Sequence, residues 1–165
     1  MNVAVIVMEL AILFLAFGFL AFGLLLINPL TFVSDYPPEI QDAYYRTQNK
    51  EATRQKLNAI MIVKKIVALI AFTFLFAWMS HIAGAETFVE GLLLVYAYAL
   101  ALFAWDTFFL DWVLFANVKR IRLPGTENMD REYHQKWFHV KVCLPMIPVF
   151  AVIGVLSSLI MVWIW

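Results

Sequence analysis

The sequence is poor in cysteine and in charge, and each shortage excludes a class of protein. Cys143 is its one cysteine, which excludes an intramolecular disulfide and any CxxC redox or metal-binding motif. Charged residues make up 15% of the chain, whereas apolar residues make up 64% and the mean hydropathy is +0.81. Soluble domains contain about 45–50% apolar residues. Water is therefore not the solvent of most of this chain.

Lysine and arginine are missing from most of the chain. All twelve lie in two windows, residues 46–65 and 119–141. These windows alternate with four long apolar stretches, a pattern typical of a membrane protein with basic cytoplasmic loops. The formal net charge is zero, and the clustered positive charge favours contact with lipid head groups over binding of nucleic acid.

The four apolar stretches predict an all-α, polytopic membrane protein. A bilayer core of about 30 Å needs about 20 apolar helical residues, which each stretch supplies. The predicted crossings cover about residues 3–28, 59–84, 88–115 and 142–165, and the predicted cytoplasmic loops cover about 29–58 and 116–141. We expect a single domain, residues 1–165, folded as an antiparallel four-helix bundle with both termini outside. The expected location is the cell membrane, as a multi-pass protein of a bacterial inner or plasma membrane.

Proline, glycine and short polar residues predict the structure of the two loops. Pro38 predicts the start of a short surface helix, and the pattern from Glu51 onward predicts that the second crossing begins in the cytoplasm. The Pro-Gly pair at 124–125 indicates a turn. Thr126 or Asn128 is the candidate N-cap of a helix that leads into the fourth crossing.

Ionisable side chains inside the apolar stretches are the candidate functional residues. Such a residue near the bilayer centre costs at least about 2.5–3.5 kcal/mol, so it usually faces the interior and often marks a functional path. The candidates are Glu9, Lys64, Lys65, His81, Glu90, Asp106 and Asp111. Counting from the helix ends places Glu9, His81 and Glu90 in an outer layer, and the other four in an inner layer.

Asp106 is the centre of the inner layer. In a low-dielectric setting its carboxyl is either protonated or paired with Lys64 or Lys65. The two lysines point about 100° apart on a helix, so we expect one to pair inward and the other to extend to the head groups. The alternative is a purely structural ion pair.

Two prolines interrupt the fourth crossing near the same depth. Pro145 and Pro148 are expected to leave the carbonyls of Lys141 and Leu144 without helical donors. Open carbonyls beside the Asp106 carboxylate would suit a cation or a substrate group, as in broken-helix transporters. An ordinary proline kink is the alternative.

The outer layer contains residue types suited to zinc or to a proton relay. Glu9, His81 and Glu90 come from three separate helices without a spacing motif, so the sequence predicts neither a metal nor any other cofactor. His134 and His139 are interpreted as solvated loop histidines, because five residues place them on different faces of a helix.

One segment has a resemblance to known proteins. Asp111-Trp112, the following KRIRLPGTENMD, and then Trp137 and His139 resemble a segment of small uncharacterised bacterial membrane proteins with four helices. The resemblance covers this loop and its flanks and implies no activity.

Two main hypotheses for function follow. The first is a proton- or ion-coupled carrier, which requires a homo-oligomer because four helices are few for an alternating-access path. The second is a non-catalytic membrane subunit or interaction protein within a larger membrane complex, with structural buried charges. A lipid-modifying enzyme that uses Asp106 and Asp111 is a further alternative, although the sequence favours a protein that is not an enzyme. Membrane lipids are the expected partners in every case.

Overall fold

The computed structural model describes residues 1–48 and 59–165, with the backbone alone at residues 59–61 and 64. Every regular element in this part of the chain is helical. Four stretches within it are long and apolar enough to cross a membrane: Val3–Ile27, Lys65–Ile82, Phe88–Phe115 and Asp130–Ile164. The prediction of an all-α chain with four membrane-length helices is confirmed. The bundle arrangement and the orientation of the termini stay predictions, and the predicted helix start near Glu51 lies outside the described residues.

The chain divides into two compact units, each built from segments that are far apart in the sequence. Unit 1 contains Met1–Phe14, Leu57–Phe103 and Cys143–Trp165. Unit 2 contains Leu15–Lys56 and Ala104–Val142. We describe each unit by itself.

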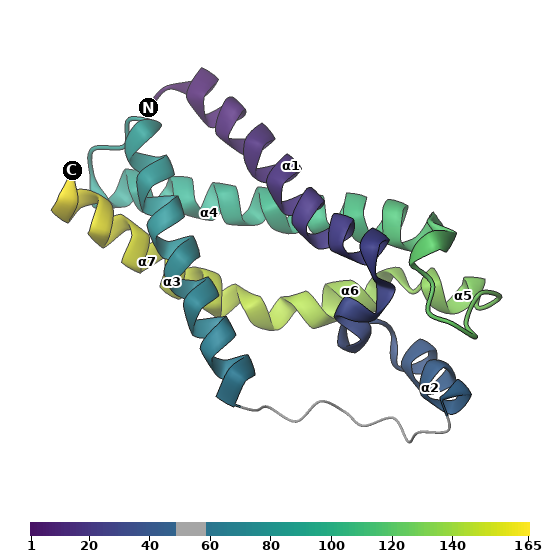
Figure 1. The fold of residues 1–165 in the computed structure, drawn as a ribbon. Helices are drawn as coiled ribbons and strands as arrows, with labels where there is room; N and C mark the ends of the chain where they lie inside the picture. Colours follow the sequence, from purple (N-terminus) through teal and green to yellow (C-terminus); the bar gives the residue numbers. More distant parts are fainter. Residues whose placement is uncertain (49–58) are drawn as a thin grey trace. The chain divides into compact units, whose positions relative to one another are not determined.

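Unit 1 is made of apolar helices that pack against one another through small residues. It contains the start of α1 (Val3–Ile27), α3 (Ala59–Ile82), nearly all of α4 (Phe88–Ala104) and α7 (Ile147–Ile164). The helices α3 and α7 pack side by side (Figure 1). At their contact the buried Ser157 hydroxyl donates a 2.9 Å hydrogen bond to the Thr73 carbonyl. Close packing of small residues and hydroxyl bonds between helices are typical of membrane interiors, where burial of apolar surface gives no driving force between helices.

The chain start and the α3–α4 connection lie together in unit 1. The Asn2 amide donates to the Ala83 carbonyl at 2.7 Å, and the Asn2 side chain accepts from the Ala4 amide at 3.0 Å, which caps α1. Gly84 turns the chain after α3 with a φ of +81°, a conformation that favours glycine. The short link predicted between the second and third crossings is therefore a tight turn over residues 83–87.

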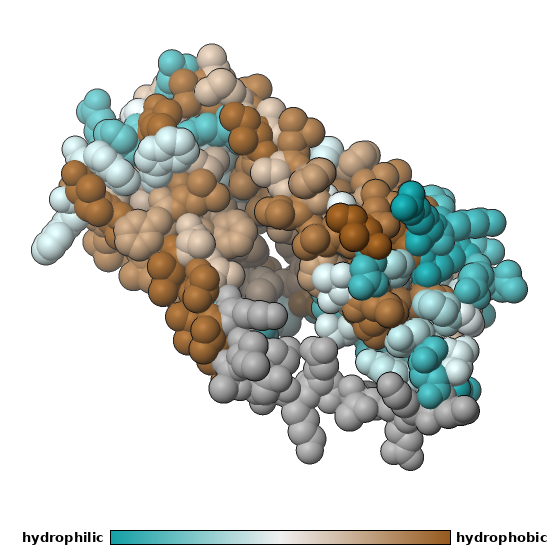
Figure 2. Space-filling view, in the orientation of Figure 1, coloured by the Kyte–Doolittle hydropathy of each residue, from teal (hydrophilic) through white to brown (hydrophobic). Residues whose placement is uncertain are grey.

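Unit 2 combines the end of α1 with shorter helical elements. These are η1 (Pro29–Asp35), α2 (Pro38–Thr47), the π-helix η2 (Trp105–Phe115), η3 (Lys119–Ile121), α5 (Asp130–Tyr133) and α6 (Lys136–Cys143). Their buried core consists of Tyr36, Ile40, Phe115, Ile121, Leu123 and Tyr133. On the face in view, hydrophilic side chains of this unit gather over α5 and the loop before it (Figure 2). The start of α2 at Pro38 confirms the predicted surface helix.

The loop over residues 122–130 is fixed by hydrogen bonds rather than by packing alone. The Tyr133 hydroxyl accepts from the Leu123 amide at 2.9 Å and lies 2.8 Å from the Thr126 hydroxyl. The buried Arg122 guanidinium donates to the Asp130 carboxylate and to the Glu127 carbonyl, and lies over the Tyr133 ring. The LPGTE segment (residues 123–127) is therefore well structured and is more than a plain connector. We name the longer segment that contains it, residues 121–133, the loop cap.

In unit 2, outside the membrane-length helices, the surroundings shift the pKa values of two side chains, Tyr36 and Glu127. Burial raises the pKa of Tyr36, whose hydroxyl donates to the Ile121 carbonyl at 2.6 Å. Hydrogen bonds from backbone amides, those of Glu127 itself and of Gly125, lower the pKa of the Glu127 carboxyl.

The helix predicted after the loop differs in its start and in its continuity. Met129 occupies the N-cap position of α5, so the predicted caps at Thr126 and Asn128 are wrong. The Thr126 hydroxyl instead donates to the Leu123 carbonyl within the turn. The chain leaves the helix at His134, because the short α5 ends at Tyr133 and α6 begins only at Lys136.

The proline interruption of the fourth crossing is a 3₁₀ segment. It runs over Leu144–Met146, between α6 and α7. The Ile147 amide donates to the Leu144 carbonyl, so the expectation of an open carbonyl at Leu144 is wrong. A 3₁₀ turn satisfies this carbonyl because its hydrogen bonds run from residue i to i+3, which bypasses the missing proline donor.

Candidate functional site

The third membrane-length helix changes from α to π geometry at Trp105. Its last eleven residues, Trp105–Phe115, form η2, and the Ala116 amide donates to the Asp111 carbonyl five residues earlier. Asp106 and Asp111 are also five residues apart, so π geometry stacks them on successive turns, whereas an α-helix would turn them roughly 140° apart. The two carboxylates lie within electrostatic range of each other. π-helical turns occur frequently at functional sites.

Asp111 has a histidine partner in unit 2. The Asp111 Oδ2 atom lies 3.3 Å from Nδ1 of His139 on α6, and the two side chains are only 16% and 14% exposed. The His139 ring packs at steep angles against Phe115 and Phe138, with centroid distances of 5.0 and 5.2 Å. The interpretation of His139 as a solvated loop histidine is therefore wrong. His134, in contrast, is exposed, as predicted.

A tryptophan fixes α6 against η2 beside this pair. The Trp112 indole donates to the Lys136 carbonyl at 3.0 Å, and the Lys136 ammonium lies 5.3 Å from the centre of the Trp112 ring. Trp137 meets Trp112 edge-on at 6.0 Å. These contacts hold the first turn of α6, and so place His139 one turn later opposite Asp111.

One buried polar atom of the pair and one of η2 are without a hydrogen-bond partner among the described residues. They are Nε2 of His139 and Oγ1 of Thr107, which is next to Asp106 and fully buried. Buried polar atoms are nearly always hydrogen-bonded in native proteins, so each unsatisfied one requires an explanation. Nδ1 of His139 lies 3.3 Å from the Asp111 carboxylate. In the neutral tautomer that carries its proton on Nδ1, Nε2 has a lone pair that can take up a proton.

Asp111 contacts His139, and Asp106 lies five residues before Asp111 on η2. We name these three residues the carboxylate–histidine site. A carboxylate orients the imidazole and stabilises its protonated form, and the second carboxylate provides another proton-exchanging group. The sequence pointed to Asp106 and Asp111 but missed His139. The signal that could have found it is the apolar surroundings of His139 in WFHVKV, read together with the DW pair at 111–112.

The three predicted outer residues have separate partners in unit 1. Glu9 accepts a hydrogen bond from the buried Tyr98 hydroxyl. His81 is exposed and stacks on Trp165 at 5.0 Å, beside a pocket of about 310 Å³. The Glu90 carboxylate accepts from the Thr87 amide at 3.1 Å while the Thr87 hydroxyl accepts from the Glu90 amide at 3.3 Å. This reciprocal pattern is a capping box that starts α4, so the carboxylate of Glu90 has a structural role.

The predicted pairing of Asp106 with a lysine stays a prediction. Lys65 is exposed on α3 and belongs to unit 1, whereas Asp106 belongs to unit 2. The side chain of Lys64 lies outside the described residues.

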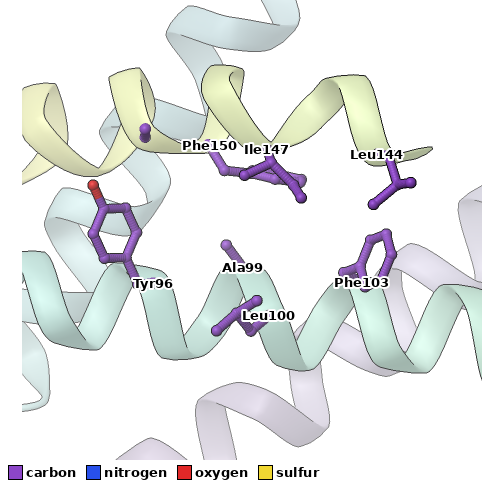
Figure 3. A pocket seen from close by; sticks show the side chains of 8 residues that line it. Tyr96, Ala99, Leu100, Phe103, Leu144, Ile147 and Phe150 are labelled. Carbon is purple, nitrogen blue, oxygen red and sulfur yellow. The ribbon is translucent and has the colours of Figure 1, made fainter. Parts of the chain in front are cut away.

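An apolar pocket of about 320 Å³ lies between α4 and α7 in unit 1 (Figure 3). Tyr96, Ala99, Leu100 and Phe103 line it from α4, and Leu144, Ile147, Phe150 and Ala151 line it from the opposite side. Gly154 allows the Tyr96 ring to lie directly against α7. The one polar side chain of this lining is the phenol of Tyr96, and the other lining residues are apolar.

The comparisons with known proteins add no family. The chain matches no protein-family model, no curated protein and no solved structure. Within the described residues, no group of three histidine, cysteine or acidic side chains is arranged to hold a metal ion.

Proposed function

We propose that this chain is a multi-pass membrane carrier that couples solute movement to protons at the carboxylate–histidine site. The observation that carries the proposal is the 3.3 Å contact of Asp111 with His139, on helices otherwise dominated by apolar residues. Ionisable residues within membrane helices are costly and rare, and chains of Asp, Glu and His residues form proton relays in pumps and transporters. The open Nε2 atom of His139 is the position from which a proton would be exchanged.

The proposed topology follows the positive charge. Both basic windows face the cytoplasm, both termini face outward, and the protein is located in the cell membrane. Because four helices are few for an alternating-access path, the carrier works as a homo-oligomer.

The test is proton movement in lipid vesicles that contain the purified protein and an internal pH-sensitive dye. Gradients of Na⁺, K⁺ and Li⁺, followed by organic solutes one class at a time, are applied to the native chain and to Asp111→Asn, His139→Gln and Asp106→Asn. We expect a solute-dependent pH change with the native chain that all three substitutions abolish, because each removes a proton-exchanging group of the site.

Matched controls separate the site from the chain as a whole. His134→Gln and Asp42→Asn change the same residue types at exposed positions and should transport like the native chain. Folded Asp111→Asn and His139→Gln variants that still transport normally would overturn the proposal. Absence of any proton movement, with the substitutions lowering only thermal stability, would favour a non-catalytic membrane subunit.

A further inference from the structure

The first membrane-length helix buries a single acidic residue. Glu9 is the seventh residue of α1, and Glu9 and Leu13 are the buried residues of this helix, at 8% and 7% exposure. They are four residues apart and therefore share one face. The remaining face is apolar and largely exposed, which suits contact with lipid. The one ionisable side chain of α1 is thus turned into the protein.

The surroundings of Glu9 are suited to a neutral carboxyl. The Tyr98 hydroxyl donates to Oε2 of Glu9, whereas Oε1 is buried and has no hydrogen-bond partner within the described part of the chain. Tyr98 is itself fully buried and stacks on Phe76 of α3. A carboxylate with one hydrogen bond in an apolar environment lacks the compensation that a buried charge needs, whereas a neutral carboxyl loses far less.

The other charged side chains described in unit 1 do not neutralise Glu9. Lys65, His81 and Glu86 are exposed, and Glu90 is bound to the Thr87 turn. The group that faces Glu9 from α4 is the phenol of Tyr98, which carries no charge as a donor. Among the described residues, the two ion pairs involve other side chains.

We propose that Glu9 and Tyr98 form a proton-binding site in unit 1, in which the Glu9 carboxyl is protonated at neutral pH. The proton lies on Oε1 and the phenol donates to Oε2. This site is distinct from the carboxylate–histidine site and does not rest on the proposed carrier function. Because Oε1 is buried, the proton that it carries is exchanged when α1 opens this contact.

The test is infrared spectroscopy of the whole protein in lipid at neutral pH, which separates the C=O stretch of a protonated carboxyl from the bands of a carboxylate. We expect the difference between the native chain and Glu9→Gln to contain a protonated-carboxyl band. The matched control Glu86→Gln, at an exposed acid of the same unit, should leave that band unchanged. Loss of only a carboxylate band in Glu9→Gln would overturn the proposal.

A second variant keeps the test valid if Glu9→Gln does not fold. Tyr98→Phe retains the carboxyl and removes its hydrogen-bond donor, so the protonated-carboxyl band should stay and move to higher frequency. A spectrum that Tyr98→Phe leaves unchanged, in folded protein, would overturn the assignment to Glu9. If the protonated-carboxyl band behaves as expected but no solute transport is found, only the carrier function is refuted. The two proposals can therefore fail separately.

Discussion

The two units of this protein are stabilised by different chemistry. In unit 1, small residues let apolar helices approach closely, as at Gly154, and single hydrogen bonds such as that from Ser157 to Thr73 join one helix to another. In unit 2, Arg122, Thr126 and Tyr133 form a connected network that fixes an irregular loop. The difference indicates two solvents. Apolar helices that pack through small residues suit lipid, whereas a loop cap held by hydrogen bonds around an apolar core suits the membrane surface.

The largest expected effect is a difference in cysteine labelling between the two sides of the membrane. With Cys143→Ala as the background, Glu86→Cys in the α3–α4 turn should react with an impermeant maleimide in intact cells, because this turn is predicted outside. Glu127→Cys in the loop cap should react only in inverted vesicles. Labelling of both positions from the same side would contradict the predicted topology.

Close packing in unit 1 predicts the next largest effect. A Cβ atom at Gly154 would lie 2.6 Å from the Tyr96 ring, so Gly154→Ala should lower the free energy of unfolding by about 3 kcal/mol, the upper end of overpacking. The control Gly23→Ala meets its nearest neighbour at an ordinary 3.8 Å, and should stabilise α1 by about 0.5–1 kcal/mol. Denaturant titration in mixed micelles measures both. Equal effects would show that the α4–α7 contact is not tight.

The hydrogen-bond network predicts a smaller effect in unit 2. Tyr133→Phe leaves the buried Leu123 amide without its acceptor, which should cost about 2 kcal/mol. Tyr44→Phe, at the edge of the same core, should change stability by less than about 0.5 kcal/mol. Limited proteolysis of the 121–133 segment measures the opening of the loop cap. A cap that resists protease equally in both variants would argue that packing, not hydrogen bonding, holds it.

The smallest effect is a pH dependence of the loop cap. Hydrogen bonds in the folded cap lower the pKa of Glu127 below its ordinary value of 4.5, so their contribution is present above that pH and is lost as the pH falls through the lower, folded value. Glu127→Gln should remove this part of the acid sensitivity, as measured by protease resistance between neutral and acid pH. The exposed Glu39→Gln is the control. Identical acid profiles for the native chain and Glu127→Gln would refute the contribution.

The all-helical class and the four membrane-length helices were predictable, because the mean hydropathy of a stretch depends only on its composition and length. Four apolar stretches predicted four membrane-length helices, and Pro38 predicted the start of α2. The N-cap predicted at Thr126 is wrong, because the Thr126 hydroxyl donates to the Leu123 carbonyl and lies 2.8 Å from the Tyr133 hydroxyl. Thr and Ser hydroxyls can bond to nearby backbone carbonyls in turns instead of capping a helix, and the turn uses the Thr126 hydroxyl in this way.

The candidate site was predictable only in part. Intramembrane acids are visible in any apolar stretch, so Asp106 and Asp111 could be named from the sequence. Glu90 could be named in the same way, but its capping box depends on the position at which α4 begins. His139 was missed because its burial depends on the packing of Phe115 and Phe138 around it.

The sequence by itself determined the helical class and the number of membrane-length helices, because these depend on sums over many residues. Only the tertiary structure decided which polar groups meet. The π geometry of η2 places Asp106 and Asp111 on successive turns. The hydrogen bond from Trp112 to α6 places His139 opposite Asp111. The packing of α1 brings Glu9 within hydrogen-bond distance of Tyr98. The physical reason is that helix period and helix contacts are set by cooperative packing, which no single residue encodes.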